Sequence, residues 1–313
     1  MLYGLLVVLA ACGSGSPHTP VGSRVAPAMT AAFAGFTEAR APWRCASDGS
    51  HLADETIKLG ERTWKLTGTT VTVDGGPITI GVIADAGGNA PDTIAALGRL
   101  HAKLADADLV IALGGMGATQ PELEATLGSL SDKAVVIALA GDLEPVPALA
   151  AAIAALRTRG RTVIDGRLAR ELELPGATIA TLPGASAAVR LAAGADGCGY
   201  TATNVTAILD RLTTRPQLRV LASAEAPRLG GDEATGQRAL SPVAGKPFDV
   251  HLHGPVTPDA TPARTGGRDG TAVPLSPGTA DATTRLPGPK HAPSAGVLAI
   301  SGGSWKWRPV ADE

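Results

Sequence analysis

The sequence has 313 residues, a formal net charge of −2 at pH 7, and a hydrophobic content of 44% with only 3% aromatic residues. A chain of this length suits one large domain or one domain with appendages, and its aliphatic residues suffice for a sizeable core. The 27 Lys and Arg residues are spread along the sequence. Because the sequence contains no basic run or stripe, it indicates neither nucleic acid nor an anionic membrane surface as a partner.

The first residues, MLYGLLVVLAACGSGS, combine a short apolar run with the tetrapeptide LAAC, which ends at Cys12. The run is too short to cross a bilayer of roughly 30 Å at about 1.5 Å per residue. It resembles a bacterial lipoprotein signal, which is cleaved before a cysteine whose thiol then carries lipid. The resemblance implies a signal peptide over 1–11, a flexible tether over 12–40, and a lipid-anchored location in the bacterial cell envelope, periplasmic or surface-facing. The alternative is an ordinary secretory signal with a chance cysteine, since no Lys or Arg precedes the apolar run.

Two further cysteines, Cys45 and Cys198, remain if Cys12 carries lipid. Export would place them where disulfides persist, so a single Cys45–Cys198 disulfide is the simplest expectation. The alternative is a pair of small, buried, unpaired residues.

Apolar strands alternate with helices from residue 77 onward. Residues 41–76, which contain the alternating segment TWKLTGTTVTV, are expected to form a β-rich amino-terminal extension with an edge strand or hairpin. The strands expected first are 78–84, 108–115, 134–142 and 162–165, and the helices between them are 91–107, 121–130 and 145–160. Later strands are expected at 177–182, 218–223, 248–253 and 296–301, with one helix at 203–212.

This alternation predicts an α/β fold (an α+β sandwich) with two central mixed β-sheets flanked by helices over 77–313. Residues 256–294 are rich in Pro, Gly, Thr and Ala without periodicity, which predicts a long surface loop. Trp305 and Trp307 alternate on a last strand and are expected to pack in the core or at its edge.

Polar side chains are sparse where the expected strands end, although parallel α/β sheets bind ligands at that edge. The turns there read DAGGN at 85–89, GGMG at 114–117, GDLE at 141–144, AEAP at 224–227 and HLHGP at 251–255. They retain a small carboxylate cluster of Asp85, Asp142 and Glu144. Clustered carboxylates repel one another, so one of them is expected to have a raised pKa or to point to solvent.

The order of these five turns resembles the calcineurin-like metallophosphoesterases over most of 78–310. That family places Asp-x-His, Gly-Asp, Gly-Asn-His-Asp/Glu, a lone His and Gly-His-x-His after successive strands, and the resemblance implies a metallophosphoesterase-like fold. Two divalent metals there lower the pKa of a water and clamp the phosphate oxygens. The resemblance carries the first Asp onto Asp85, the Asn ligand onto Asp142 and the final acid onto Glu144. The other family positions fall, in chain order, on Gly87 (a His ligand), Gly115 (the bridging Asp), Leu143 (the catalytic His), Ala224 (a His), Pro255 and Thr257 (the last His pair).

The loss of the bridge and of most imidazoles implies no dinuclear centre and no resident cofactor. A reduced site remains an alternative, because His251 and His253 lie two residues apart on a strand and share one face. With Asp85 and Asp142 they would hold one divalent metal, Mn, Fe or Zn. Otherwise His253 supports the turn and His251 is half-buried on the sheet.

Two other chemistries are weakly indicated. Backbone N–H groups of Gly114, Gly115 and Gly117 would cradle an anion, or the glycines simply make a tight strand-to-helix turn. Ser186 and Ser223 lie in turns, but no His or Asp is placed by sequence to activate either of them, and no Gly-x-Ser-x-Gly elbow is present.

Three functions follow from this reading. The first is a lipid-anchored protein of metallophosphoesterase fold, catalytically degenerate, that binds an unknown protein or small molecule. The second is an active metal-dependent phosphoester hydrolase with the reduced site. The third is a surface lipoprotein that recognises partners through the loop 256–294.

Overall fold

The computed structural model describes residues 50–130, 133–186, 191–227, 240, 246–255, 257–282 and 291–312. The expectations for the signal peptide, the tether, Cys12 and Cys45 therefore lie outside the described residues. Within the described segments, no helix has the length and apolar character needed to cross a membrane.

One sheet has seven strands in the order β12-β15-β14-β4-β5-β6-β7. Its parallel half consists of β4 (Ile78–Ile83), β5 (Leu109–Ala112), β6 (Val135–Ala138) and β7 (Val163–Asp165). The crossovers are α2 (Pro91–Lys103), α3 (Gln120–Gly128) and α4 (Val146–Thr158). Its antiparallel half consists of β14 (Ser294–Ser301), β15 (Ser304–Ala311) and the edge strand β12 (Arg264–Gly267).

The other sheet has eight strands in the order β1-β2-β3-β8-β9-β10-β11-β13. An antiparallel meander starts it, made of β1 (Leu52–Leu59), β2 (Arg62–Gly68) and β3 (Thr70–Val73). It continues through β8 (Glu171–Leu174), β9 (Ala177–Leu182), β10 (Leu218–Ser223), β11 (Val250–His253) and β13 (Val273–Leu275). The helix α5 (Ala202–Thr213) precedes β10, and a 3-10 turn, η2 (Gly194–Asp196), precedes α5.

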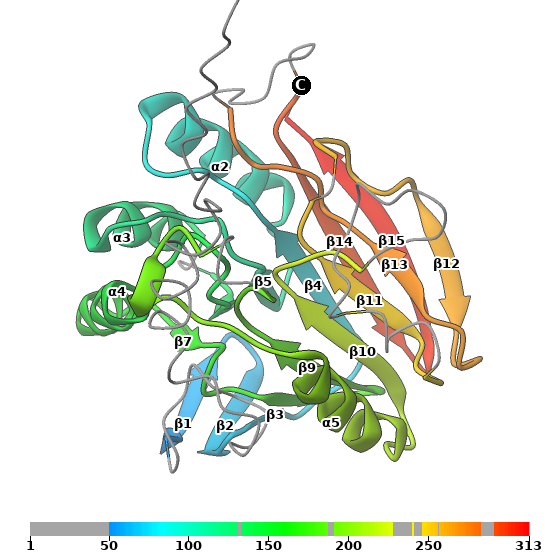
Figure 1. Ribbon diagram of the computed structural model, residues 1–313. Helices are drawn as coiled ribbons and strands as arrows, with labels where there is room; N and C mark the ends of the chain where they lie inside the picture. The colour runs from blue at the N-terminus through cyan, green and yellow to red at the C-terminus, as the bar shows by residue number, and fades with distance from the viewer. Residues whose placement is uncertain are drawn as a thin grey trace, which may run out of the picture.

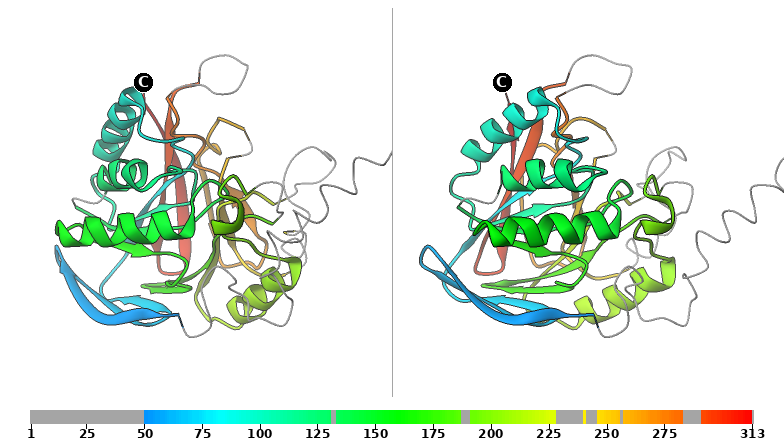
Figure 2. Two further views of the ribbon diagram at one scale, coloured as in Figure 1. Left: turned by 60° about the vertical axis from the view of Figure 1, so that its left-hand side comes forward. Right: turned by 90° about the vertical axis from the view of Figure 1, so that its left-hand side faces the viewer.

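The two sheets pack face to face and helices cover their outer faces. Figure 1 shows α2, α3 and α4 stacked on one side of the molecule and α5 beside β9 and β10, and the left view of Figure 2 shows the sheets between them. Side chains of both sheets form one apolar cluster, which includes Trp64, Ile80, Ile111, Val220 and Trp307. The expected α/β sandwich of two mixed sheets flanked by helices is thus confirmed.

A half-buried cation joins the sheets at the edge opposite the turns. The Arg62 guanidinium on β2 donates to the Asp108 carboxylate at 2.6 and 3.0 Å and to the Pro77 carbonyl at 2.5 Å. Asp108 also accepts the Thr79 N–H at 2.9 Å, just ahead of β5. The meander is thereby fixed to the amino ends of β4 and β5.

The structure differs from the sequence expectation between residues 256 and 294. That segment is not a structureless surface loop, because it contains β12, paired with β15, and β13, paired with β11. Leu275 on β13 is fully buried. Short strands such as RTGG and VPL pair through their backbones, and they carry too few apolar side chains to show a period of two.

Other details correct or support the expected elements. The strand β8 was not expected, although the hairpin within 41–76 is present and its β3 pairs with β8. Trp305 and Trp307 are buried with 4% and 0% exposure, which confirms their packing role.

Candidate functional site

The five turns predicted to converge do lie together at the carboxyl ends of the strands, and they touch through their backbones. A Cβ atom added to Gly114 would lie 2.8 Å from the Gly141 Cα and 3.3 Å from the Ala224 Cβ. A Cβ atom on Gly115 would lie 2.7 Å from the Asp85 Cα. Since real Cβ atoms do not approach other carbons this closely, glycine is what allows these turns to meet.

The turns are also hydrogen-bonded to one another. The Asp85 N–H donates to the Gly114 carbonyl at 2.9 Å, and the Gly87 N–H donates to the Gly115 carbonyl at 2.8 Å. Both glycines after β5 have positive φ, 103° for Gly114 and 72° for Gly115. The family's bridging carboxylate would have to start from Gly115, whose Cα faces the Asp85 backbone.

Asp85 is half-buried and lies beneath a strap of residues 277–282. It is the non-glycine residue with positive φ, 53°, among those the structure describes. The Thr279 hydroxyl lies 2.9 Å from the Asp85 carbonyl oxygen and 3.1 Å from its Oδ2. The Ala280 N–H donates to the Ala84 carbonyl at 2.9 Å. The strap therefore covers the end of β4 and engages the carboxylate that the resemblance marks as a metal ligand.

Glu144 is the buried member of the carboxylate cluster. Its Oε1 accepts the Met116 N–H at 2.6 Å and its Oε2 accepts the Gly141 N–H at 2.7 Å. Burial raises the pKa of the Glu144 carboxyl to about 7, against the lowering effect of these hydrogen bonds, and the nearby Asp142 charge raises it further. A raised carboxyl pKa was expected in this cluster from charge repulsion, but burial of Glu144 is its main cause. The N–H of Met116, in the GGMG turn considered as an anion cradle, thus faces a carboxylate of the protein itself.

Asp142 and Leu143 are both half-buried. Leu143, onto which the resemblance carries the family's catalytic His, has an aliphatic side chain that cannot donate a proton. The Asp142 carbonyl accepts the Ala193 N–H at 3.4 Å, which ties this turn to the η2 segment.

His251 and His253 do share one face of β11, but it is the outer face of the eight-stranded sheet. Their neighbour Leu221 packs with α5, whereas Ala222 and Leu252 belong to the core between the sheets. Burial lowers the pKa of both imidazoles, most strongly that of His251, where the neighbouring His253 adds to the effect. The His253 Nδ1 lies 2.8 Å from the Gly254 carbonyl, so this nitrogen carries the proton and donates it.

The sequence indicated no His near Ser223, but the structure places one beside it. The His251 Nε2 lies 2.7 Å from the Ser223 Oγ, and the Ser223 hydroxyl donates to the Glu225 carbonyl at 2.6 Å. Ser223 is fully buried and its proton is already engaged, so the pair is a structural contact between β10 and β11. Only the pairing of these strands places the two side chains together, and the sequence holds no local signal for it.

A further polar contact was missed in the next turn. The Glu225 Oε2 accepts the Tyr200 hydroxyl at 2.5 Å and the Ser186 N–H at 2.7 Å. Glu225 is 8% exposed. It therefore connects the end of β10 with the segment that precedes α5.

The residues present do not fit the metal centre that the resemblance implies. Across the described ranges, no three His, Cys, Asp or Glu side chains form a group that could hold one metal ion. Asp85, Asp142, His251 and His253 are all within those ranges, so the structure does not gather them into the reduced site. Metal binding by these four residues stays a prediction for experiment.

Comparison with known proteins places the chain by architecture. No protein-family model matches the sequence, and no curated protein matches it. Among solved structures, one chain is matched over 100% of its length and 76% of this chain, with 10% identity and a TM-score of 0.50. The likeness is one of fold.

Two other solved structures match with TM-scores below 0.5. The protein TT1561 of Thermus thermophilus shares 12% identity over 72% of this chain and 99% of its own, with a TM-score of 0.48. A metallophosphoesterase from Sphaerobacter thermophilus shares 11% identity over 75% of this chain and 88% of its own, with a TM-score of 0.36.

A carboxylate placed at Gly115, where the resemblance puts the family's bridging Asp, should destabilise the protein. In Gly115→Asp, the new Cβ would meet the Asp85 backbone at a positive φ, so we expect a loss of roughly 2–4 kcal/mol in unfolding free energy. Gly302→Asp is the matched control, because its φ is 57° and nothing lies within 4 Å of its added Cβ. Urea unfolding of both variants measures the difference. Equal stability of the two would show that the turns can open to admit a side chain.

Glu144 should make stability depend on pH. Its folded-state pKa of about 7 lies above the value of 4.5 expected in the unfolded chain, so the folded state holds more protons between these values. As the pH rises from about 4.5 through about 7, the free energy of unfolding of the wild type should therefore fall by roughly 3 kcal/mol relative to that of Glu144→Gln. This figure takes about 1.4 kcal/mol for each unit of pKa difference. Urea unfolding of both proteins at pH 5 and pH 8 measures this change. Glu61→Gln, at an exposed position, is the control, and a wild-type to Glu144→Gln difference that is constant with pH would contradict the prediction.

Proposed function

We propose that this chain is a lipid-anchored protein of metallophosphoesterase-like fold that has lost phosphoester hydrolysis and acts by binding. The observation that supports this most directly is the contact between Gly115 and Asp85. It leaves the bridging position without a side chain and without space for one. A dinuclear centre needs a shared anionic ligand to hold two cations a few Å apart, and here backbone occupies that place.

The chemistry of the neighbouring positions supports the same proposal. Leu143 cannot transfer a proton, and Glu144 is engaged by two backbone N–H groups. The Asp85 carboxylate is close to the Thr279 hydroxyl of the strap. The residues that remain at the turns therefore stabilise the turns themselves, and binding would use surfaces around them.

The other candidates differ from this proposal in measurable ways. An active hydrolase would need Asp85, Asp142, His251 and His253 to converge on one ion. A lipoprotein that recognises partners through 256–294 would present that segment, of which β12 is exposed at the edge of the seven-stranded sheet.

We propose that Cys12 carries the lipid and that Cys45 pairs with Cys198. Cys198 is fully buried, and its carbonyl accepts the Ala185 N–H at 2.9 Å beside the turn cluster. A disulfide there would attach the segment that precedes β1 to the site. An exported chain with two non-lipidated cysteines favours such a pairing.

Intact-mass measurement of the mature protein from membranes tests both parts. We expect cleavage before Cys12 with an added diacylglyceryl group, and a further deficit of two hydrogens that reduction reverses. Cys12→Ser should lose the lipid mass and keep the deficit. A chain that is cleaved elsewhere, or that carries two free thiols, would contradict the corresponding part.

Metal content tests the loss of hydrolysis. The full chain is loaded with Mn²⁺, Fe²⁺ or Zn²⁺, desalted, and analysed for bound metal and for p-nitrophenyl phosphate hydrolysis. We expect a small fraction of one ion per chain and no activity above the buffer, because no side-chain group within the described ranges is arranged for the ion. One ion per chain that is lost in His253→Ala, but kept in His101→Ala, would instead establish the reduced hydrolytic site.

A further inference from the structure

The outer face of the seven-stranded sheet is covered by α2 at one end of β15. There the Arg99 guanidinium binds the Asp312 carboxylate at 2.7 Å, and the Lys103 ammonium donates to the Ala311 carbonyl at 2.5 Å. Toward the other end of β15, Thr265 and Lys306 are opposite each other and both are exposed. The outer face at that end is therefore open to solvent.

A hollow of about 560 Å³ lies on this open face. The registers place Thr265, Lys306, Ala299 and Thr79 in one row across four strands, on the face opposite the buried Trp305. The lining also includes Ser301 and Ser304, and Lys306 is the only charged residue among the described residues that line it. Hydroxyls around a single ammonium group are suited to anionic oxygen atoms.

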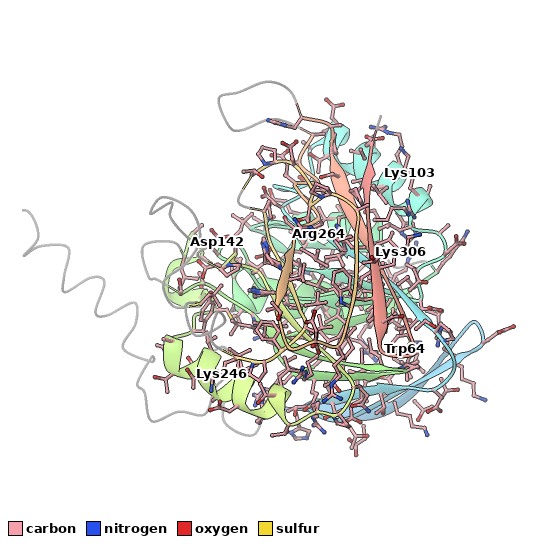
Figure 3. The ribbon with its side chains drawn as sticks, turned by 90° about the vertical axis from the view of Figure 1, so that its right-hand side faces the viewer. Trp64, Lys103, Asp142, Lys246, Arg264 and Lys306 are labelled. Carbon is pink, nitrogen blue, oxygen red and sulfur yellow. The ribbon has the colours of Figure 1, made fainter. Side chains whose placement is uncertain are left out.

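Further cations lie on this side of the molecule, on β12 and just after it, on β15, and at the end of α2. We call Lys103, Arg264, Arg268, Lys306 and Arg308 the basic flank, and all five are exposed. Figure 3 looks onto this side of the molecule, where Lys103, Arg264 and Lys306 are labelled. Among the described residues, no carboxylate forms an ion pair with any of the five. Lys103 lies close enough to the Asp312 carboxylate to help lower its pKa, so the unpaired charge of the flank is mainly that of the other four cations.

The flank was invisible in the sequence because its members are scattered from residue 103 to residue 308. Pairing of β12 with β15 places Arg264 opposite Trp307, so Arg264 leaves the edge strand on the face opposite Lys306 and Arg308. The helix α2 adds Lys103 at the Ala311 end of β15. A protein with a net charge of −2 thus presents a locally cationic side.

We propose that the basic flank docks on the phosphate groups of an anionic bilayer and so orients the domain on the membrane that holds its lipid anchor. This inference rests on the anchor at Cys12 proposed above. Each Lys or Arg near an anionic surface increases binding roughly fivefold, so the flank alone would bind only weakly. A tether changes this, because a random-coil linker as long as residues 13–44, between Cys12 and the paired Cys45, would have a mean span of roughly 30 Å and keep the domain at a high effective concentration.

Docking by the flank fixes which surfaces face away from the membrane. Lys306 would lie at the phosphate level. Lys58 on β1 and Lys133 are exposed outside the flank and would remain in solvent. Lys58 and Lys133 therefore serve as internal controls for Lys306.

Lysine labelling of the full lipidated chain on vesicles tests the proposal. The chain is bound to vesicles of pure phosphatidylcholine or of phosphatidylcholine with phosphatidylglycerol, and acetylation of each lysine is measured by mass spectrometry. We expect labelling of Lys306 to fall several-fold on the anionic vesicles and to recover in 0.5 M salt, which screens the attraction. Labelling of Lys58 and Lys133 should not change between the two vesicles.

Charge-neutral variants complete the test. Arg264→Gln/Arg308→Gln removes two cations, so the affinity of the flank for the anionic surface should fall by roughly 25-fold. The protection of Lys306 from acetylation should be lost with it. Lys58→Gln/Lys133→Gln removes the same charge elsewhere and should keep the protection. Equal labelling of Lys306 on both vesicles, with the chain still floating on both, would overturn the flank and leave the anchor intact.

Failure of the anchor gives a different result. If the chain floats on anionic vesicles alone and Lys306 is still protected there, the lipid anchor is refuted and the docking face is supported. If the chain floats on neither vesicle, both parts of the inference are overturned.

Discussion

Backbone contact between the turns after β4, β5 and β6 is the constraint from which the rest of the site follows. Gly115 leaves no space between its Cα and Asp85, and Gly114 does the same toward Gly141. The Ala224 side chain, from the other sheet, packs against this junction. These contacts leave no room for a side chain at Gly114 or Gly115.

Such tight glycine turns create a second requirement, because their backbone N–H groups are buried and need acceptors. Glu144 supplies both acceptors from a single side chain, one oxygen to Met116 and one to Gly141. The cost of burying its charge is reflected in the raised pKa. Glu144 is thus part of the scaffold of the turns.

Much of the architecture was predictable because the strands β4, β5 and β6 are short continuous apolar runs followed by glycine turns. The same logic placed Asp85 and Glu144 at one edge of the fold. It did not reveal β12 or β13, whose pairing depends on backbone groups, nor the contact between His251 and Ser223, which depends on strand register. The basic flank could not be predicted from the sequence either, because its cations come from different strands and a helix and do not form a run along the chain.

The position of β14 between β4 and β15 has a consequence for how the chain acquires its structure. β4 begins at Ile78, yet one of its two neighbours begins only at Ser294. Folding of such distant pairings is slow, because a long loop must close before the contacts form. A chain made from its amino terminus presents an unpaired, apolar β4 edge until almost its last residue is available. The order of strands thus makes protection of this edge, until the last strands are available, part of what the fold requires.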